Sequence, residues 1–137
     1  MKIFTDTNVL VSAFTARGLC ADLFEIILAD HTLMTGEFVL NELDRVLLKK
    51  LKIPERKVSD TIQLLRRYHV EPVPDEPSTL NVRDEDDKWV LQSAIKANAD
   101  ILITGDKDLL VESESVQQLR IISPRDFWDL LKNNRGL

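Results

Sequence analysis

Residues 1–10 read MKIFTDTNVL: a short apolar strand that ends on a carboxylate and is followed within two residues by an apolar helix. Asp6 therefore lies at the carboxyl end of a predicted strand, where open α/β sheets place their ligand crevice. A carboxylate there is costly unless a hydrogen-bond donor or a metal compensates its charge. Asp6, Thr7 or Asn8 would equally serve as a helix cap. Taken alone, this stretch favours the cap.

Composition indicates a globular chain. With 137 residues, 44% of them hydrophobic and 30% charged, we expect a single domain, residues 1–137, around one core. No apolar stretch approaches the ~20 residues that a membrane span requires, and Asp6 and Asn8 interrupt the segment that a secretory signal would need. Cys20 is the only cysteine, which excludes an internal disulfide and a cysteine-rich zinc site. We therefore expect a cytoplasmic protein.

Charge is distributed unevenly along the chain. The net charge of −5 at first argues against a nucleic-acid partner. Residues 44–67, however, contain eight Lys and Arg against three Asp and Glu, whereas residues 75–114 contain eleven Asp and Glu against four Lys and Arg. The first segment is suited to a polyanion and the second to a cation, although charged helices are most often simply solvated.

Short apolar strands alternate with amphipathic helices throughout the sequence. The pattern predicts strands at 3–5, 32–35, 70–73, 100–104 and 120–122, and helices at 9–16, 21–29, 37–51, 54–68, 86–97 and 124–133. This alternation predicts an α/β fold of three layers, in which a mostly parallel twisted sheet of about five strands has helices on both faces. If successive strands are added first on one side of the first strand and then on its other side, the crevice lies between the first and the fourth strand.

Four acidic residues from separate predicted elements point toward one end of this sheet. Asp6 ends the first strand, and Asp106 follows the fourth. Glu42 borders the apolar face of the third helix, and Asp87 lies in the first turn of the fifth, where free amides stabilise a negative charge. Four like charges in one crevice repel each other unless a cation lies among them. An all-oxygen ligand set without His or Cys suits Mg²⁺ or Mn²⁺.

Each of these acids also has a purely structural explanation. Asp87 would be a favourable first-turn charge, and its register is uncertain by one residue because residues 84–86 are acidic too. Asp106 would form a turn after Gly105, and Glu42 would be a solvated helix residue. For Glu42 alone the structural explanation is favoured, whereas the four acids together favour a metal site.

The four acidic motifs are spread over nearly the whole chain. In their order and spacing, the sequence resembles the PIN-domain family of metal-dependent ribonucleases, which includes the VapC-type toxins of toxin–antitoxin pairs. Residues 6–10, DTNVL, resemble the first motif of the family, and residues 104–108, TGDKD, resemble the closing one. The resemblance implies a catalytic and metal-binding set of Asp6, Glu42, Asp87 and Asp106. It also implies that this set is supported by Asn8, Thr104 and Asp108.

The resemblance further implies an activity and partners. It implies a PIN-like fold, an Mg²⁺- or Mn²⁺-dependent endoribonuclease that hydrolyses RNA, and a toxin of a type II pair that forms a homodimer and is silenced by an antitoxin protein. An RNA backbone needs cationic contacts. The candidates are Arg17 and Lys107 near the crevice and, in the basic segment, Lys49, Lys50, Lys52, Arg56 and Lys57.

Two other classes of protein fit part of the pattern. A receiver-type phosphoacceptor has a similar length, a parallel sheet and an Asp cluster that holds Mg²⁺. It needs a Lys after the fifth strand and an Asp after the third, where this chain has Ser123-Pro124 and Glu71-Pro72. A PIN module that binds RNA or protein without cleavage is the other alternative, and the presence of all four acids argues against it.

Overall fold

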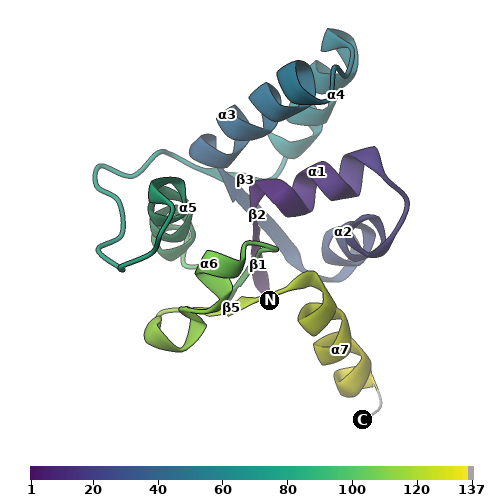
Figure 1. The fold of residues 1–137 in the computed structure, drawn as a ribbon. Coiled ribbons are helices and arrows are strands. Elements are labelled where there is room, and N and C mark those ends of the chain that lie inside the picture. The colour runs from purple at the N-terminus through teal and green to yellow at the C-terminus, as the bar shows by residue number, and fades with distance from the viewer. Residues whose placement is uncertain (136–137) are drawn as a thin grey trace.

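One five-stranded sheet forms the centre of the protein (Figure 1). The structure, a computed structural model, describes the backbone of residues 1–135 and the side chains of residues 1–133. The strand order is β3-β2-β1-β4-β5, and each neighbouring pair is parallel. The prediction of a mostly parallel sheet of about five strands is thus confirmed. The strands are β1 Lys2–Thr5, β2 Thr32–Gly36, β3 His69–Glu71, β4 Ile101–Ile103 and β5 Arg120–Ile122.

Helices cover both faces of the sheet, as the alternating pattern predicts. Figure 1 shows α1, α2 and α7 on one side and α5 on the other, while α3 and α4 form a hairpin that projects beyond the strand ends. None of the described helices is both long and apolar enough to span a membrane. The helices are α1 Thr7–Thr15, α2 Leu19–Asp30, α3 Glu37–Arg45, α4 Glu55–Leu65, α5 Glu85–Lys96, α6 Lys107–Leu110 and α7 Pro124–Arg135.

The third helix differs from its predicted form. The α-helical part ends at Arg45, and a π-helical turn, η1, continues it over Val46–Lys50. The amide of Leu51 closes this wider turn by donating to the carbonyl of Val46 at 3.0 Å. Lys52 then takes a left-handed conformation with φ 56°. A hydrophobic repeat of three or four residues does not distinguish a π turn from a continuous α-helix, which is why the pattern predicted one helix.

Two further differences have simple causes. Strand β3 ends at Glu71 rather than at residue 73, because Pro72 and Pro74 have no amide to donate to a neighbouring strand. Residues 107–110, for which no helix was predicted, form the single turn α6. Four residues are too short to show a helical period.

Pairing of β1 with β4 determines where the functional residues lie. Ile3, Phe4, Leu102 and Ile103 are completely buried, as expected for strands covered on both faces. The amide of Asp6, one residue beyond β1, donates to the carbonyl of Ile103 at 3.1 Å. The carboxyl ends of these two strands are therefore fixed side by side.

Candidate active site

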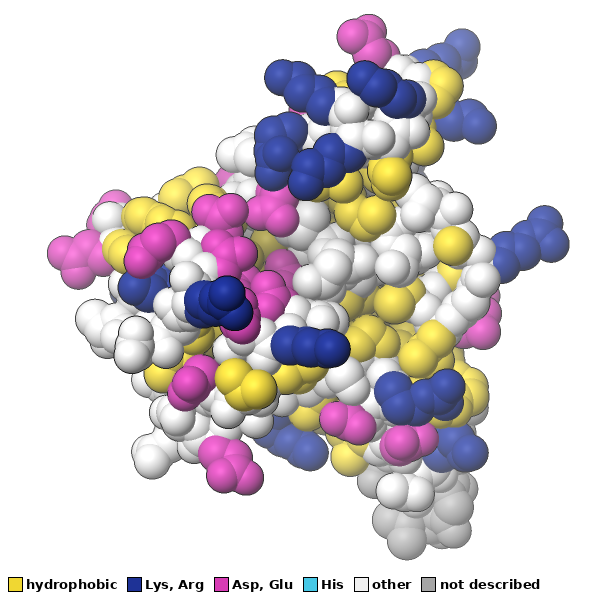
Figure 2. Space-filling model, in the orientation of Figure 1, with side chains coloured by type: hydrophobic (Ala, Val, Ile, Leu, Met, Phe, Trp, Pro, Cys, Tyr) yellow, Lys and Arg dark blue, Asp and Glu magenta, His cyan; other side chains and the backbone are white. Residues whose placement is uncertain are grey.

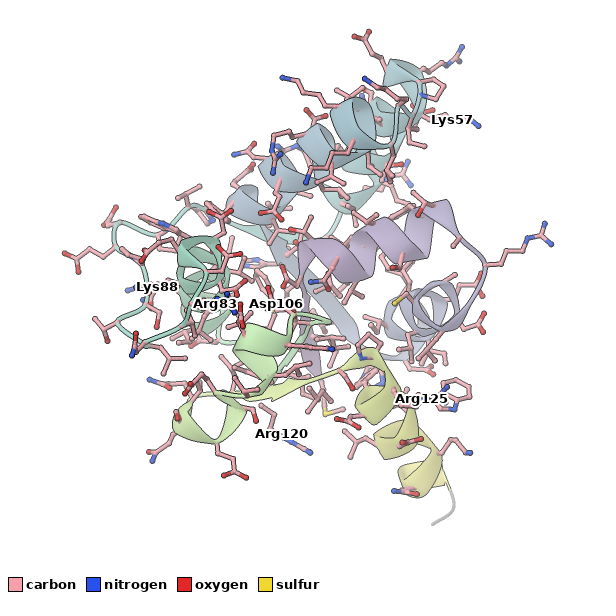
Figure 3. All side chains as sticks on the ribbon, in the orientation of Figure 1. Lys57, Arg83, Lys88, Asp106, Arg120 and Arg125 are labelled. Carbon is pink, nitrogen blue, oxygen red and sulfur yellow. The ribbon has the colours of Figure 1, made fainter. Side chains whose placement is uncertain are left out.

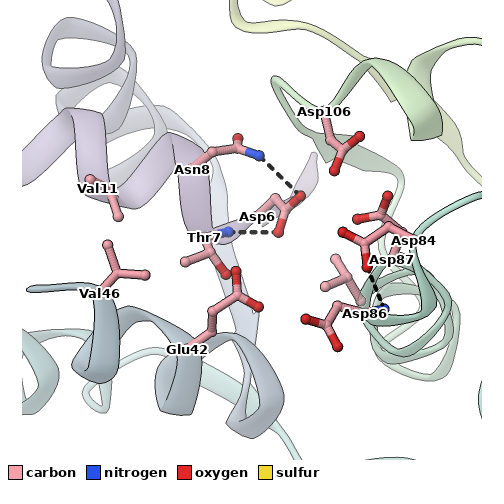
Figure 4. Close-up of a pocket in the computed structure, with 11 residues that line it drawn as sticks. Asp6, Thr7, Asn8, Val11, Glu42, Val46, Asp84, Asp86, Asp87 and Asp106 are labelled. Carbon is pink, nitrogen blue, oxygen red and sulfur yellow. Dashed lines mark hydrogen bonds between the residues drawn. The ribbon is translucent and has the colours of Figure 1, made fainter. Parts of the chain in front are cut away.

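A crevice of about 260 Å³ opens at the carboxyl ends of β1 and β4. Figure 2 shows acidic side chains gathered in a hollow beside the α3–α4 hairpin, and Asp106 lies at the start of α6, near α5 (Figure 3). The crevice brings together all four predicted acids and two more. Its carboxylates come from Asp6, Glu42, Asp84, Asp86, Asp87 and Asp106, and its other lining residues are Thr7, Asn8, Val11, Val46 and Val90 (Figure 4).

Asp6 is only 4% exposed and receives three hydrogen bonds. The amide of Thr7 donates to Oδ1 at 2.7 Å, the hydroxyl of Thr104 donates to Oδ2 at 2.8 Å, and Nδ2 of Asn8 donates to Oδ2 at 3.4 Å. Asp6 thus caps α1 and lines the crevice at the same time, so the capping role does not exclude a role in the crevice. Burial raises the pKa of Asp6, and the hydrogen bonds from Thr104 and Thr7 partly oppose that increase.

Asn8 and Thr104 also fix the loop that follows β4. Oδ1 of Asn8 accepts a hydrogen bond from the amide of Gly105 at 2.9 Å, and the hydroxyl oxygen of Thr104 accepts one from the amide of Asp106 at 3.0 Å. The same two side chains donate to Asp6. They therefore connect the two strand ends that supply Asp6 and Asp106.

Asp87 lies opposite Asp6 and is also only 4% exposed. Its Oδ2 has no hydrogen-bond partner among the described residues. One carboxylate oxygen each from Asp84, Asp87 and Asp106 lies within 4.8 Å of the others. Burial, followed by the hydrogen bond and charge of Asp106, raises the pKa of Asp87 to about 8. An unpaired buried oxygen beside two other carboxylates fits a divalent cation that prefers oxygen ligands.

Glu42 lies on the α3 wall of the crevice and is partly buried. Burial raises its pKa, the charges of Asp6 and Asp86 raise it further, and Arg45 opposes them. Glu42 is therefore close enough to the other carboxylates to share their electrostatic field. The solvated helix residue, which was the favoured explanation for Glu42 alone, is not what the structure shows.

The remaining predicted residues lie outside the crevice lining. The amide of Asp108 donates to Oδ1 of Asp106 at 2.8 Å, while Lys107 is exposed at the start of α6. Lys49 and Lys50 are exposed at the end of η1. Arg17 follows the carboxyl end of α1, whereas Asp6 precedes its amino end, so the nine-residue helix separates them by roughly 14 Å. The structure thus does not bring Arg17 to the crevice, where it was expected.

Asp84 and Asp86 are crevice residues that the sequence interpretation did not select. Asp84 is the N-cap of α5, and its Oδ1 accepts a hydrogen bond from the amide of Asp86 at 3.0 Å. The available signal was the run of four acids at residues 84–87. Near a helix start, a one-residue change in register changes which of these side chains face the crevice, and spacing alone could not resolve this.

Several solved structures are similar to this fold at low sequence identity. A chain of the VapBC2 complex from Rickettsia felis, bound to a promoter DNA fragment, is similar with a TM-score of 0.65 and 18% identity, over 90% of this chain and 98% of that one. VapC20 of Mycobacterium tuberculosis, described as a toxin that cleaves the sarcin–ricin loop, gives a TM-score of 0.59 and 17% identity, over 86% and 98%. A PilT N-terminus domain protein from Sulfolobus solfataricus gives 0.55 and 13%, over 92% and 89%.

Sequence comparison identifies the family. No curated protein matches the chain. A family model described as "PIN domain" matches residues 2–108, a span that includes all six carboxylates of the crevice. That span is well over half of the 137 residues. The chain therefore belongs to the PIN domain family.

Proposed function

We propose that this PIN domain is a metal-dependent endoribonuclease that hydrolyses phosphodiester bonds in RNA. The observation that carries the proposal is the convergence of six carboxylates on one crevice, two of which, Asp6 and Asp87, are almost inaccessible to solvent. Buried carboxylates this close together repel each other. A divalent cation relieves that repulsion and can at the same time promote phosphodiester hydrolysis.

The residues of the crevice would have two kinds of role, metal binding and support of the metal ligands. Asp6, Glu42, Asp87 and Asp106 would hold Mg²⁺ or Mn²⁺, and Asp84 lies close enough to join them. When bound, such an ion lowers the pKa of a coordinated water and offsets charge on the leaving oxygen. The carboxylates then act as ligands rather than as general bases. Asn8 and Thr104 hold Asp6 in one orientation through the hydrogen bonds described above.

The proposal extends to a toxin role. The similarity in fold to VapC20, which is described as a toxin, and to a chain of the VapBC2 complex supports a toxin of a type II pair that an antitoxin protein binds and inhibits. We include a homodimer in this proposal. Sedimentation of the purified chain, alone and with the product of a neighbouring gene, tests the dimer and the antitoxin complex separately.

Strand order excludes the receiver-type phosphoacceptor. Receivers have the flavodoxin-like order 2-1-3-4-5, in which the first and third strands are neighbours. Here β1 lies between β2 and β4, and β3 is at the edge of the sheet. A chain with this order cannot place an acid after β3 next to Asp6. The non-catalytic PIN module remains the competing function, and it predicts RNA binding without cleavage.

Comparison of the wild type with Asp6→Asn on mixed RNA tests the activity. We expect the wild type to cleave with Mg²⁺ or Mn²⁺ and to stop when a chelator is added, and we expect Asp6→Asn to be inactive. Asp22→Asn is a matched control, because Asp22 is an exposed carboxylate in the first turn of α2, outside the crevice. Equal cleavage by wild type and Asp6→Asn would indicate a contaminant. Binding without cleavage by the wild type would indicate the non-catalytic module.

A further inference from the structure

Exposed cations gather on the projecting hairpin next to the crevice. We define the basic arm as residues 45–57, which comprise the end of α3, the π turn η1 and the start of α4. Figure 2 shows Lys and Arg side chains grouped over this hairpin, directly beside the acidic hollow. Glu55 is the only acid within it. The exposed cations of the arm are Arg45, Lys49, Lys50, Lys52, Arg56 and Lys57.

None of these six cations is engaged in an ion pair within the described part of the chain. The three ion pairs found there join Arg66 to Glu37, His69 to Glu71 and Lys88 to Glu85. The cationic groups of the arm are therefore available to a negatively charged ligand. Exposed like charges on one hairpin repel each other, and a bound polyanion would remove that repulsion.

The arm continues the wall of the crevice. Glu42 and Val46 both line the crevice, and they are separated by four residues, which places them on one face of the helix. Lys49 and Lys50 end the π turn η1 that begins at Val46, so they follow the crevice wall directly on the same hairpin, and both are exposed. Arg45 is close enough to lower the pKa of Glu42. A ligand in the crevice therefore meets the cations of the arm with no intervening element.

The opposite wall has the reverse charge. Residues 84–87, at the start of α5, are four consecutive acids, three of which line the crevice. The nearby cations are Arg83 and Lys88, and Lys88 is already paired with Glu85 at 2.9 Å. A phosphate chain that left the crevice over this wall would pass exposed carboxylates. The arm offers the attractive path.

We propose that the substrate is a single nucleic-acid strand that enters the crevice over the basic arm, with its phosphates on Arg45, Lys49 and Lys50. This inference rests on the proposed function and deepens it by naming the substrate and its direction of approach. Glu42 and Lys50 are eight positions apart along α3 and the π turn η1, which is roughly 10–12 Å along the helix axis. With a spacing of about 3.4 Å per nucleotide in a stacked strand, at least three or four nucleotides lie on the arm side of the scissile bond.

Binding of a fluorescent twelve-nucleotide RNA, measured by anisotropy at low salt in the inactive Asp6→Asn background, tests the path. We expect Lys49→Glu/Lys50→Glu to weaken binding at least tenfold. Loss of two phosphate contacts should also lower the slope of log Kd against log salt concentration by about 1.4. The matched control is Arg120→Glu/Arg125→Glu, which changes the net charge equally at two exposed positions on β5 and α7 (Figure 3); we expect less than a twofold change.

Three outcomes would overturn the proposal: no loss of affinity in the arm variant, an equal loss in both double variants, or binding of poly-glutamate as tight as that of RNA of equal charge. Melting curves of both variants verify that each is folded. RNAs of increasing length give a second measurement. Affinity should increase with each nucleotide added on the arm side of the crevice, up to about four, and should not increase with nucleotides added on the other side. Cleavage of a small chromogenic phosphodiester by the wild type tests the nuclease function independently of the arm.

Discussion

The hydroxyl of Thr104 donates a hydrogen bond of 2.8 Å to Oδ2 of Asp6, and the two residues are 98 positions apart in the sequence. This bond connects the carboxyl end of β4 to that of β1 inside the buried part of the crevice. It is the shorter of the two hydrogen bonds that Oδ2 accepts, since that from Asn8 measures 3.4 Å. The orientation of Asp6 therefore depends strongly on Thr104.

Thr104→Val should impair the site while preserving its shape. The substitution removes the donor to Asp6, and loss of such a supporting group typically reduces metal affinity or activity by roughly 10–100-fold. Thr104→Ser keeps the hydroxyl and should remain within a few fold of the wild type. Isothermal titration with Mn²⁺ and an RNA cleavage assay measure both effects. Wild-type affinity in Thr104→Val would show that the bond is dispensable.

Stability of the metal-free protein should decrease as the pH rises. Asp87 has a pKa of about 8 in the folded protein, above the value of about 4 in an unfolded chain. The folded state then holds a proton that the unfolded state loses, so its stabilising contribution is complete below about pH 4 and disappears as the pH rises through about 8. Since one pKa unit corresponds to about 1.4 kcal/mol, we expect the free energy of unfolding to fall by at least about 1 kcal/mol.

Urea denaturation in the presence of a chelator, at pH 5 and at pH 8.5, measures this change. Asp87→Asn cannot ionise and should flatten the pH dependence. Burial also raises the pKa of Asp6 and Glu42, so a residual slope in the same direction should remain in that variant. A rise in stability over this pH range would contradict the assignment.

Divalent cations should stabilise the folded protein most where its carboxylates are ionised. A ligand at 100 times its Kd that binds only the folded state adds about 2.7 kcal/mol. We expect Mg²⁺ or Mn²⁺ to raise the melting temperature more at pH 8 than at pH 5.5, because protons compete for the same oxygens. Asp106→Asn should remove most of this increase, whereas Asp22→Asn should leave it unchanged. Equal increases in both variants would place the cation outside the crevice.

Asp84 combines a capping role with a position on the crevice, and two substitutions separate these. Asp84→Asn keeps an oxygen that accepts from the amide of Asp86, so the stability should stay close to that of the wild type while Mn²⁺ binds more weakly. Asp84→Ala also loses the cap, which costs about 1 kcal/mol. Urea denaturation with a chelator, combined with Mn²⁺ titration, distinguishes the two. Identical stabilities would mean that the capping bond contributes little.

The strand next to Asp6 should be sensitive to truncation. Leu102 in β4 is completely buried, whereas Val111 is 76% exposed. Leu102→Ala should lower the free energy of unfolding by about 2–5 kcal/mol, because a cavity remains in the core. Val111→Ala should change it by less than about 0.5 kcal/mol. Thermal or urea unfolding measures both, and similar losses at the two positions would be inconsistent with this core.

Much of the fold could be predicted because its signals are local and repeated. The strands at Ile3 and Ile101 are short apolar runs that end at polar residues, and the intervening helices show clear periodicity. Handedness and strand direction then constrain the topology. The family and the fold class are confirmed by the matching family model and by the parallel sheet. The turn α6 and the π turn η1 were missed because neither produces a period of its own.

The candidate site was less predictable, because it depends on orientation rather than on composition. The four acids selected from the sequence do line one crevice, but Asp84 and Asp86 were not selected. Which members of a run of acids face inward is decided by the residue at which the helix begins, here Glu85. Arg17 was expected near the crevice, but the nine-residue helix α1 lies between it and Asp6. The catalytic roles remain predictions that the experiments above test.

Because Asp6 and the Thr104 hydroxyl that donates to it are 98 positions apart, no short fragment contains the crevice. In a chain that is still being synthesised, β1 is complete long before β4. At that stage Asp6 has neither β4 beside it nor the acids of residues 84–87 and 106 opposite it. Only after Asp106 has left the ribosome are all the acids available. If the protein cleaves RNA, a nascent chain therefore cannot do so before residue 106 has been synthesised and has folded beside Asp6.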